Sequence, residues 1–233
     1  MGRKQHKRAR SAKDLARRKE FRRERERVLI VTEGAKTEPA YFRKLIQELG
    51  LTTATVSIVG DGGSAPISVL EHAQTLLAQD REFEFIYLVF DRDRHDSYDQ
   101  AISEANSMAQ NRDFKAKTIA VIPSIPCFEI WYLFHQSDSR KPYESAKSGG
   151  SPANALIKDL KASALHFKTY RKADCSEFFD TIRPNRPQAK QRAKRALSEA
   201  KNEKQPKYHE NPSTRVHILV ERLEKLSEEQ VDR

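Results

Sequence analysis

The chain has 233 residues, a formal charge of +10 and 33% charged residues. It is long enough to bury a substantial core, and no stretch approaches the run of about 20 apolar residues that a membrane-spanning helix needs. The two cysteines, Cys127 and Cys175, are too few for a disulfide framework or a four-cysteine zinc site. We therefore expect free thiols in a cytoplasmic protein.

The positive charge is concentrated in two segments. Residues 1–27 carry a balance of +9 and residues 183–207 a balance of +7, which leaves the rest of the chain at −6. The first segment has few apolar residues, so residues 1–26 are predicted to be a basic, flexible arm. Such arms bind nucleic acid through phosphate contacts that release counterions, although a merely solvated terminus has the same composition.

Strands and helices are predicted to alternate over the first half of the chain. The apolar run Val28–Val31 predicts a strand buried on both faces, and helical spacing of apolar residues follows over Thr37–Leu49. The elements expected next are strand Val56–Val59, helix Pro66–Gln79, strand Phe85–Phe90, helix Tyr98–Asn111 and strand Thr118–Ile122, which Pro123 should stop. This order predicts an α/β domain over residues 27–136, with a mostly parallel sheet covered by helices.

The second half of the chain is predicted to be helical. Residues 126–135 are apolar and aromatic, residues 139–150 resemble a loop, and helices are expected at 152–164, 185–203 and 213–229. Ser213 or Thr214 can cap the last of these helices. Residues 137–233 therefore form a predicted helical C-terminal extension that packs on the α/β domain.

Acidic residues follow two of the predicted strands. Glu33 comes after the first strand, and Asp91 and Asp93 come after the third. Ligands of parallel sheets bind at the carboxyl ends of strands, and alternate residues of an extended segment point the same way, so the two aspartates can face one cation. Oxygen ligands suit Mg²⁺ or Mn²⁺. An isolated Asp-x-Asp is weak evidence, because aspartate is also common in turns.

Three separated motifs resemble known families. Residues 28–34 (Val-Leu-Ile-Val-Thr-Glu-Gly) and 90–93 (Phe-Asp-Arg-Asp) look like a TOPRIM domain, the domain of topoisomerases, primases and OLD-type nucleases. Residues 33–42, with 124–131 (Ser-Ile-Pro-Cys-Phe-Glu-Ile-Trp) and 211–217, are similar to the RloB family of bacterial defence-associated proteins. The resemblance spans roughly residues 27–229 and leaves out the basic arm.

The resemblance implies a metal-dependent TOPRIM-type nuclease, or nuclease-like effector, of an anti-phage system that acts with an ATPase partner. Glu33 would be the general base or first metal ligand, and Asp91 and Asp93 would bind Mg²⁺. Glu38 and Glu129 are the candidate ligands of a second metal. Each of these acids alone also has a structural interpretation; for example, Glu38 suits the first turn of a helix.

Other polar residues are candidates for substrate contact. Ser124 can donate to a phosphate or cap a helix, and His217 can reach the site or simply pack. His95 can transfer protons or be a solvated loop residue. Gly60–Gly63 can cradle a phosphate or form a plain turn. The basic segment from Arg183 onward, with Arg186, Lys190 and Lys194 as the named candidates, can hold a DNA or RNA backbone or be a solvated helix face.

Two other functions fit parts of the sequence. A non-catalytic nucleic-acid-binding or regulatory subunit of an ATPase-containing defence complex would tolerate the loss of Asp91 or Asp93. A glycosyltransferase that holds a metal-bound sugar nucleotide through Asp-x-Asp would not need Glu33, and it would leave the basic arm unexplained. The sequence leaves open whether the substrate is DNA or RNA.

Overall fold

A computed structural model describes residues 26–58, 65–93, 95–111, 118–145, 150–172 and 175–231. The basic arm over residues 1–25 and the glycine-rich turn at 60–63 lie outside the described residues. None of the described helices combines the length and the apolar character that crossing a membrane requires.

Five strands form one sheet in the order β2-β1-β3-β4-β5. They are β1 (Val28–Thr32), β2 (Ala54–Ile58), β3 (Phe85–Asp91), β4 (Thr118–Ile125) and β5 (Ser213–Thr214). The first four strands are parallel, and β5 runs antiparallel to β4. The predicted α/β class with a mostly parallel sheet is confirmed.

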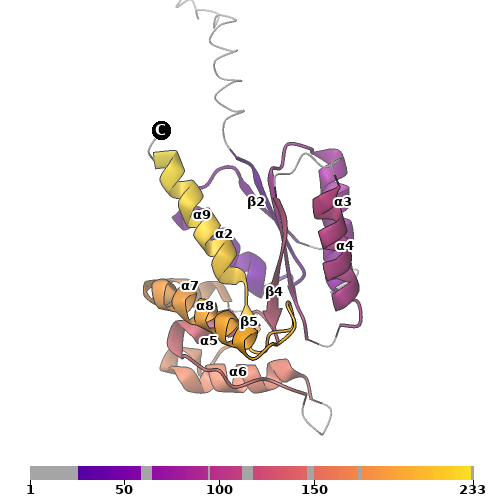
Figure 1. Cartoon of the computed structure of the whole chain (residues 1–233). Helices are drawn as coiled ribbons and strands as arrows, with labels where there is room; N and C mark the ends of the chain where they lie inside the picture. The colour runs from indigo at the N-terminus through magenta and orange to yellow at the C-terminus, as the bar shows by residue number, and fades with distance from the viewer. Residues whose placement is uncertain are drawn as a thin grey trace, which may run out of the picture.

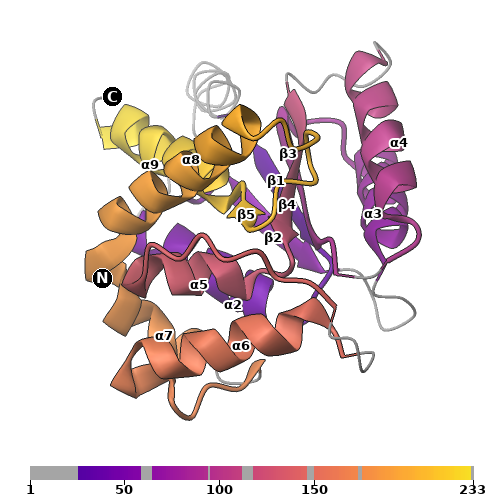
Figure 2. The same cartoon turned by 60° about the horizontal axis from the view of Figure 1, so that its bottom comes forward.

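Helices cover both faces of this sheet and extend beyond it (Figure 1). They are α2 (Thr37–Glu48), α3 (Pro66–Gln79), α4 (Tyr98–Gln110), α5 (Glu129–Gln136), α6 (Pro152–Ser163), α7 (Cys175–Ile182), α8 (Arg186–Asn202) and α9 (Val216–Val231), with short 3₁₀ turns at Leu165–Phe167 and Arg183–Asn185. In Figure 1, α3 and α4 lie on one side of the sheet, and α2 and α9 lie on the other. Figure 2 shows α5 between α6 and α8.

The central strands are apolar on both faces because both faces are covered. In β1, Val28 and Ile30 join the core beneath α2, α5 and α9, whereas Leu29 and Val31 join the core beneath α3 and α4. This explains why these strands appear in the sequence as unbroken apolar runs rather than alternating patterns. The core beneath α2, α5 and α9 includes residues from both predicted segments, 27–136 and 137–233; the boundary between these segments stays a prediction.

Two predictions about the elements were wrong. Strand β4 does not stop at Pro123 but continues to Ile125. The carbonyl of Pro123 accepts a hydrogen bond from the amide of Arg215, at 3.1 Å. The N–H and C=O of a strand residue point to the same side, and the carbonyl of Pro123 points away from β3. An N–H at this position would also point away from β3, so the proline removes no hydrogen bond between β3 and β4.

The last predicted helix also begins later than expected. Ser213 and Thr214 form β5, paired with Ile125 and Ser124, and α9 starts only at Val216. The hydroxyl oxygen of Thr214 accepts a hydrogen bond from the amide of Val216, at 3.1 Å, so the expected capping residue performs its role from within the strand. Helix α7 was not predicted.

Candidate metal centre

Acidic residues follow β1, end β3 and begin the helix after β4, near the carboxyl ends of these strands. These strand ends lie toward the bottom of Figure 1. Strand β3 ends at Asp91, which lies opposite Ser124 of β4. Glu33 follows β1 directly, and its Oε2 accepts a hydrogen bond from the Asp91 amide at 3.1 Å. The structure therefore brings together the acids that follow the first and third strands, as the parallel topology predicts.

Asp91 lies close to Cys127, in the segment that joins β4 to α5, and to Glu129 at the start of α5. The Sγ of Cys127 and carboxylate oxygens of Asp91 and Glu129 all lie within 4.8 Å of one another, so these residues can bind a metal ion together. Cys127 and Glu129 are 1% and 0% exposed. Along β3, Tyr87 and Val89 face the core beneath α2 and α5, and the alternation of a strand puts Asp91 on that same side.

Glu129 is the first residue of α5, and its two carboxylate oxygens have different surroundings. Oε1 accepts a hydrogen bond from the hydroxyl of Tyr170 at 2.9 Å and lies 3.6 Å from the ammonium of Lys172. Oε2 is buried and has no hydrogen-bond partner among the described residues. Such an oxygen costs about 1–3 kcal/mol or more if it stays unpaired, so its position fits a cation ligand.

Glu38 lies in the first turn of α2, over Gly34. A Cβ atom at position 34 would lie 2.4 Å from Oε2 of Glu38 and 2.8 Å from Oε1. The glycine therefore lets the Glu38 carboxylate approach the backbone between β1 and α2. Glu38 is only 6% exposed, which holds this carboxylate inside the site.

The carboxylates disfavour one another's ionisation. Burial raises the pKa of Glu33 to about 7, and the charge of Glu38 adds to this increase. Burial likewise raises the pKa of Glu38 to about 7, with a contribution from Glu129. For Asp91, burial and then the charges of Glu38 and Glu129 hold the pKa well above its ordinary value. A divalent cation would offset this repulsion, so the donor set fits a metal.

Lys172 is the cation that faces these acids. Burial lowers its pKa, but the charges of Glu129 and Asp91 outweigh that effect and hold the pKa above its ordinary value. The lysine side chain is still 52% exposed. The ammonium therefore contacts Glu129, while about half of the lysine side chain stays exposed.

Asp93 does not extend β3 as the sequence pattern suggested. It follows the strand in a turn with φ +28°, and its amide donates to the carbonyl of Pro126 at 3.0 Å. Its Oδ1 accepts a hydrogen bond from the hydroxyl of Ser151, which caps α6, at 2.7 Å. The assumed extended geometry is thus wrong, because the chain turns after Asp91, and the role of Asp93 as a metal ligand stays a prediction.

His95 faces Glu33, since its Nε2 lies 3.1 Å from Oε1 of that residue. Ser124 is buried, and its hydroxyl is hydrogen-bonded to that of Thr214 at 2.9 Å. His217 is also buried; its Nδ1 lies 3.1 Å from the carbonyl of Thr214, and burial lowers its pKa to about 4. Ser124 and His217 thus have partners at the β4–β5 junction, and their substrate contacts stay predictions.

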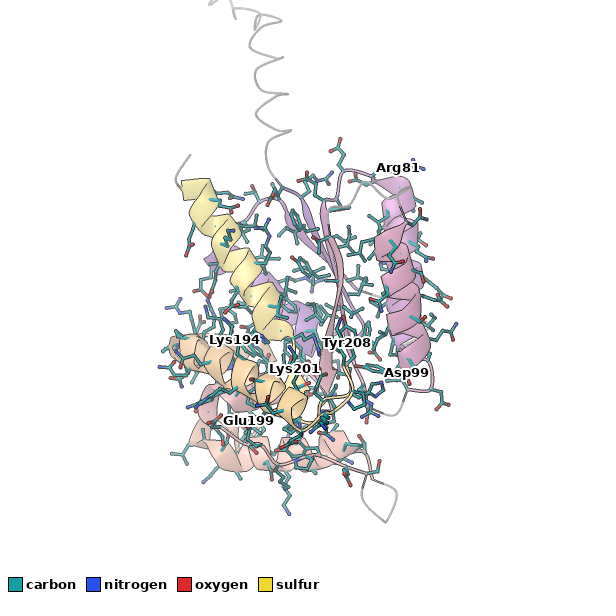
Figure 3. The ribbon with its side chains drawn as sticks, viewed as in Figure 1. Arg81, Asp99, Lys194, Glu199, Lys201 and Tyr208 are labelled. Atoms are coloured by element: carbon teal, nitrogen blue, oxygen red, sulfur yellow. The ribbon has the colours of Figure 1, made fainter. Side chains whose placement is uncertain are left out.

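The three basic candidates of α8 face acids within the chain. Arg186 pairs with Glu48 of α2 at 2.5 Å, and Lys190 pairs with Glu224 of α9 at 2.5 Å. Lys194 lies on α8, next to α9, and pairs with Glu221 at 2.6 Å (Figure 3). These ion pairs join α8 to its neighbours. Contact of the three residues with nucleic acid stays a prediction.

Sequence reasoning missed three residues of this centre: Cys127, Tyr170 and Lys172. Cys127 lies within the same short motif as Glu129, so its spacing to that acid was a usable signal. Tyr170 and Lys172 lie in an irregular segment after α6 that has no apolar periodicity. Only the packing of that segment brings it to the site.

Comparison with protein families gives one clear result. The model of a family described as RloB-like protein matches residues 28–223, which is most of the chain. Comparisons with curated proteins and with solved structures gave no significant match.

Proposed function

The chain belongs to the RloB-like family, and from this premise we propose that it is a TOPRIM-type nuclease. It hydrolyses phosphodiester bonds of DNA or RNA with the help of Mg²⁺ or Mn²⁺. We further propose that it is the cytoplasmic effector of an anti-phage, abortive-infection system and acts with an ATPase partner subunit.

The observation that supports this proposal best is the acid cluster at the carboxyl ends of β1, β3 and β4. Glu33 and Glu129 come from separate parts of the sequence, yet burial and the charges of both raise the pKa of Asp91. A buried concentration of negative charge is unfavourable without a function or a cation. The same arrangement argues against the glycosyltransferase alternative, because Glu33 touches the Asp91 backbone rather than lying apart from the site.

The residues of the site have roles that suit hydrolysis. A divalent ion bound there would supply charge to the phosphate and increase the acidity of a water molecule. Glu33, with a pKa of about 7, can accept a proton near neutral pH, and His95 contacts the same carboxylate. Lys172, whose side chain is about half exposed and whose ammonium contacts Glu129, would meet a phosphate that approaches the acids.

The test is a nuclease assay of the full chain with Mg²⁺ or Mn²⁺, on plasmid DNA and on total tRNA. We expect wild type to cut one of these substrates and Asp91→Asn and Glu129→Gln to lose at least about 2.7 kcal/mol of transition-state stabilisation, or a hundredfold in rate. Asp99→Asn is the matched control, because Asp99 is 75% exposed on the side chain and pairs only with His209 among the contacts described for its carboxylate. Cutting that persists in Asp91→Asn would exclude this site.

A non-catalytic subunit remains the alternative function, and a different result would favour it. In that case neither wild type nor the variants would cut nucleic acid, in the assay or in cells challenged with phage. Wild type and the variants would all still bind nucleic acid. Expression in bacteria followed by phage challenge adds the biological readout. If wild type protects and Asp91→Asn does not, defence depends on the acid cluster.

A further inference from the structure

The thiol of Cys127 has no part in the hydrolysis proposed above. It nevertheless lies in the centre of the site, because its Sγ is within 4.8 Å of carboxylate oxygens of both Asp91 and Glu129. Cys127 is 1% exposed, in the turn between β4 and α5. Cys127 packs with the apolar core beneath α2, α5 and α9, yet unlike a cysteine that only fills space it also lies beside two carboxylates.

A second, independent observation points to a ligand at this place. Glu129 is fully buried, and its Oε2 has no hydrogen-bond partner within the described part of the chain, although Oε1 is bound by Tyr170. The fold thus provides a partner for one oxygen of Glu129 and none for the other, in a side chain whose carboxylate lies close to Asp91 and Cys127. A bound cation would satisfy this oxygen.

We propose that Asp91, Cys127 and Glu129 form a mixed oxygen–sulfur site that selects a thiolate-tolerant divalent ion, Mn²⁺ or Zn²⁺, over Mg²⁺. The inference rests on the acid cluster of the proposed function but not on its catalytic activity. Thiolate is a soft ligand that favours transition metals, whereas Mg²⁺ strongly prefers oxygen. As the sulfur–metal bond forms, the thiol proton leaves to solvent.

The charges around the site agree with one divalent ion. The two carboxylates and a thiolate carry three negative charges, and the ammonium of Lys172, 3.6 Å from Glu129, supplies one positive charge. A divalent cation neutralises these four groups, and the carboxylates of Glu33 and Glu38 beside them add further negative charge when they ionise.

The test is a titration of the full chain with Co²⁺, which reports a bound thiolate through a sulfur-to-cobalt charge-transfer band in the near ultraviolet. We expect the band in wild type and in Cys175→Ser, the variant of the other cysteine, and we expect its loss in Cys127→Ser. Calorimetric titrations with Mn²⁺ and with Mg²⁺ measure the affinity for each ion, and the ratio of the two affinities gives the selectivity. Cys127→Ser should lower the ratio of Mn²⁺ to Mg²⁺ affinity at least tenfold.

Two further outcomes keep the proposal open to refutation. If Cys127→Ser fails to fold, judged by circular dichroism, Cys127→Ala removes the sulfur without burying a new polar group, and it should likewise lose the band and lower the ratio of Mn²⁺ to Mg²⁺ affinity. Co²⁺ binding by wild type without the band, or an unchanged affinity ratio in the folded variants, overturns the proposal. A charge-transfer band in a protein without nuclease activity would instead support the site and contradict the proposed function.

Discussion

Replacing Glu33 by Gln should stabilise the metal-free protein at alkaline pH. Burial raises the pKa of Glu33 from 4.5 to about 7. Each unit of difference between the pKa values of the folded and unfolded states corresponds to about 1.4 kcal/mol of stability. The folded state therefore opposes ionisation of this carboxyl by about 3 kcal/mol. Glutamine has nearly the same shape and carries no charge, so the variant should avoid most of this cost.

The sign of the pH dependence follows from proton binding. Between pH 4.5 and about 7, the folded protein holds a proton on Glu33 that the unfolded chain releases, so stability falls as pH rises through this window. Above pH 7 the full cost is present. We expect Glu33→Gln to be more stable than wild type by up to about 3 kcal/mol at pH 8, and by less than about 1 kcal/mol at pH 5.

Urea denaturation with a chelator present measures this effect. With a slope near 3 kcal/mol per molar urea, about 3 kcal/mol moves the midpoint by about 1 M. The other titrating groups are common to both proteins, so the difference between pH 5 and pH 8 reports Glu33 together with its charge coupling to Glu38 and Asp91. Glu82→Gln is the control: Glu82 is 81% exposed on its side chain, so its loss should change stability by about 0.5 kcal/mol or less. A Glu33→Gln variant that is no more stable than wild type at pH 8 would refute the reasoning.

Three other substitutions test the fold and the site. Arg215→Met should cost about 3–5 kcal/mol in urea denaturation, because it leaves the buried carboxylate of Glu210 without its ion-pair partner. Burial lowers the pKa of His135 to about 3, so acid protonates this histidine in the unfolded chain before the folded protein, and wild type loses stability as pH falls from 8 to 5. His135→Phe lacks this histidine, so its free energy of unfolding should fall by about 2 kcal/mol less over the same pH range. Gly34→Ala should displace the carboxylate of Glu38 and weaken Mn²⁺ binding in calorimetric titration roughly tenfold, about 1.4 kcal/mol.

Each of these predictions has a matched control or a contradicting result. Lys194→Met breaks an ion pair that is 55% and 36% exposed, so it should cost under about 1 kcal/mol, in contrast to Arg215→Met. Equal acid sensitivity of wild type and His135→Phe would mean that His135 does not stay neutral in the folded state. Unchanged Mn²⁺ affinity in a folded Gly34→Ala would show that the position of Glu38 does not matter for the metal.

The sequence predicts the sheet well because local and tertiary preferences agree there. Phe85–Phe90 is apolar without interruption, and a doubly covered parallel strand requires such a run. The meeting of Glu33 with Asp91 follows from the same topology. Strand β5 could not be predicted, since two residues carry no periodicity and only pairing with Ser124 and Ile125 makes them a strand.

The features that the sequence did not reveal have a common physical cause, which is that packing decides the partner of a side chain. Lys190 and Lys194 read as a basic face in the sequence, but α9 places acids opposite them. Asp93 matched an alternating pattern that holds only while the backbone stays extended, and the chain turns at this residue. Lys172 gave no signal, because its contact with Glu129 depends on how an irregular segment folds back.

The contact of Tyr170 and Lys172 with Glu129 has a consequence for biosynthesis. During translation the acids at positions 33, 38, 91 and 129 are synthesised first, and Tyr170 follows Glu129 by 41 residues. Until that later segment has emerged, the nascent chain has neither the hydroxyl nor the ammonium that faces the Glu129 carboxylate. The surroundings of Glu129 are therefore completed only by a contact between distant parts of the chain, which is slow to form. A prematurely terminated product would lack part of the centre.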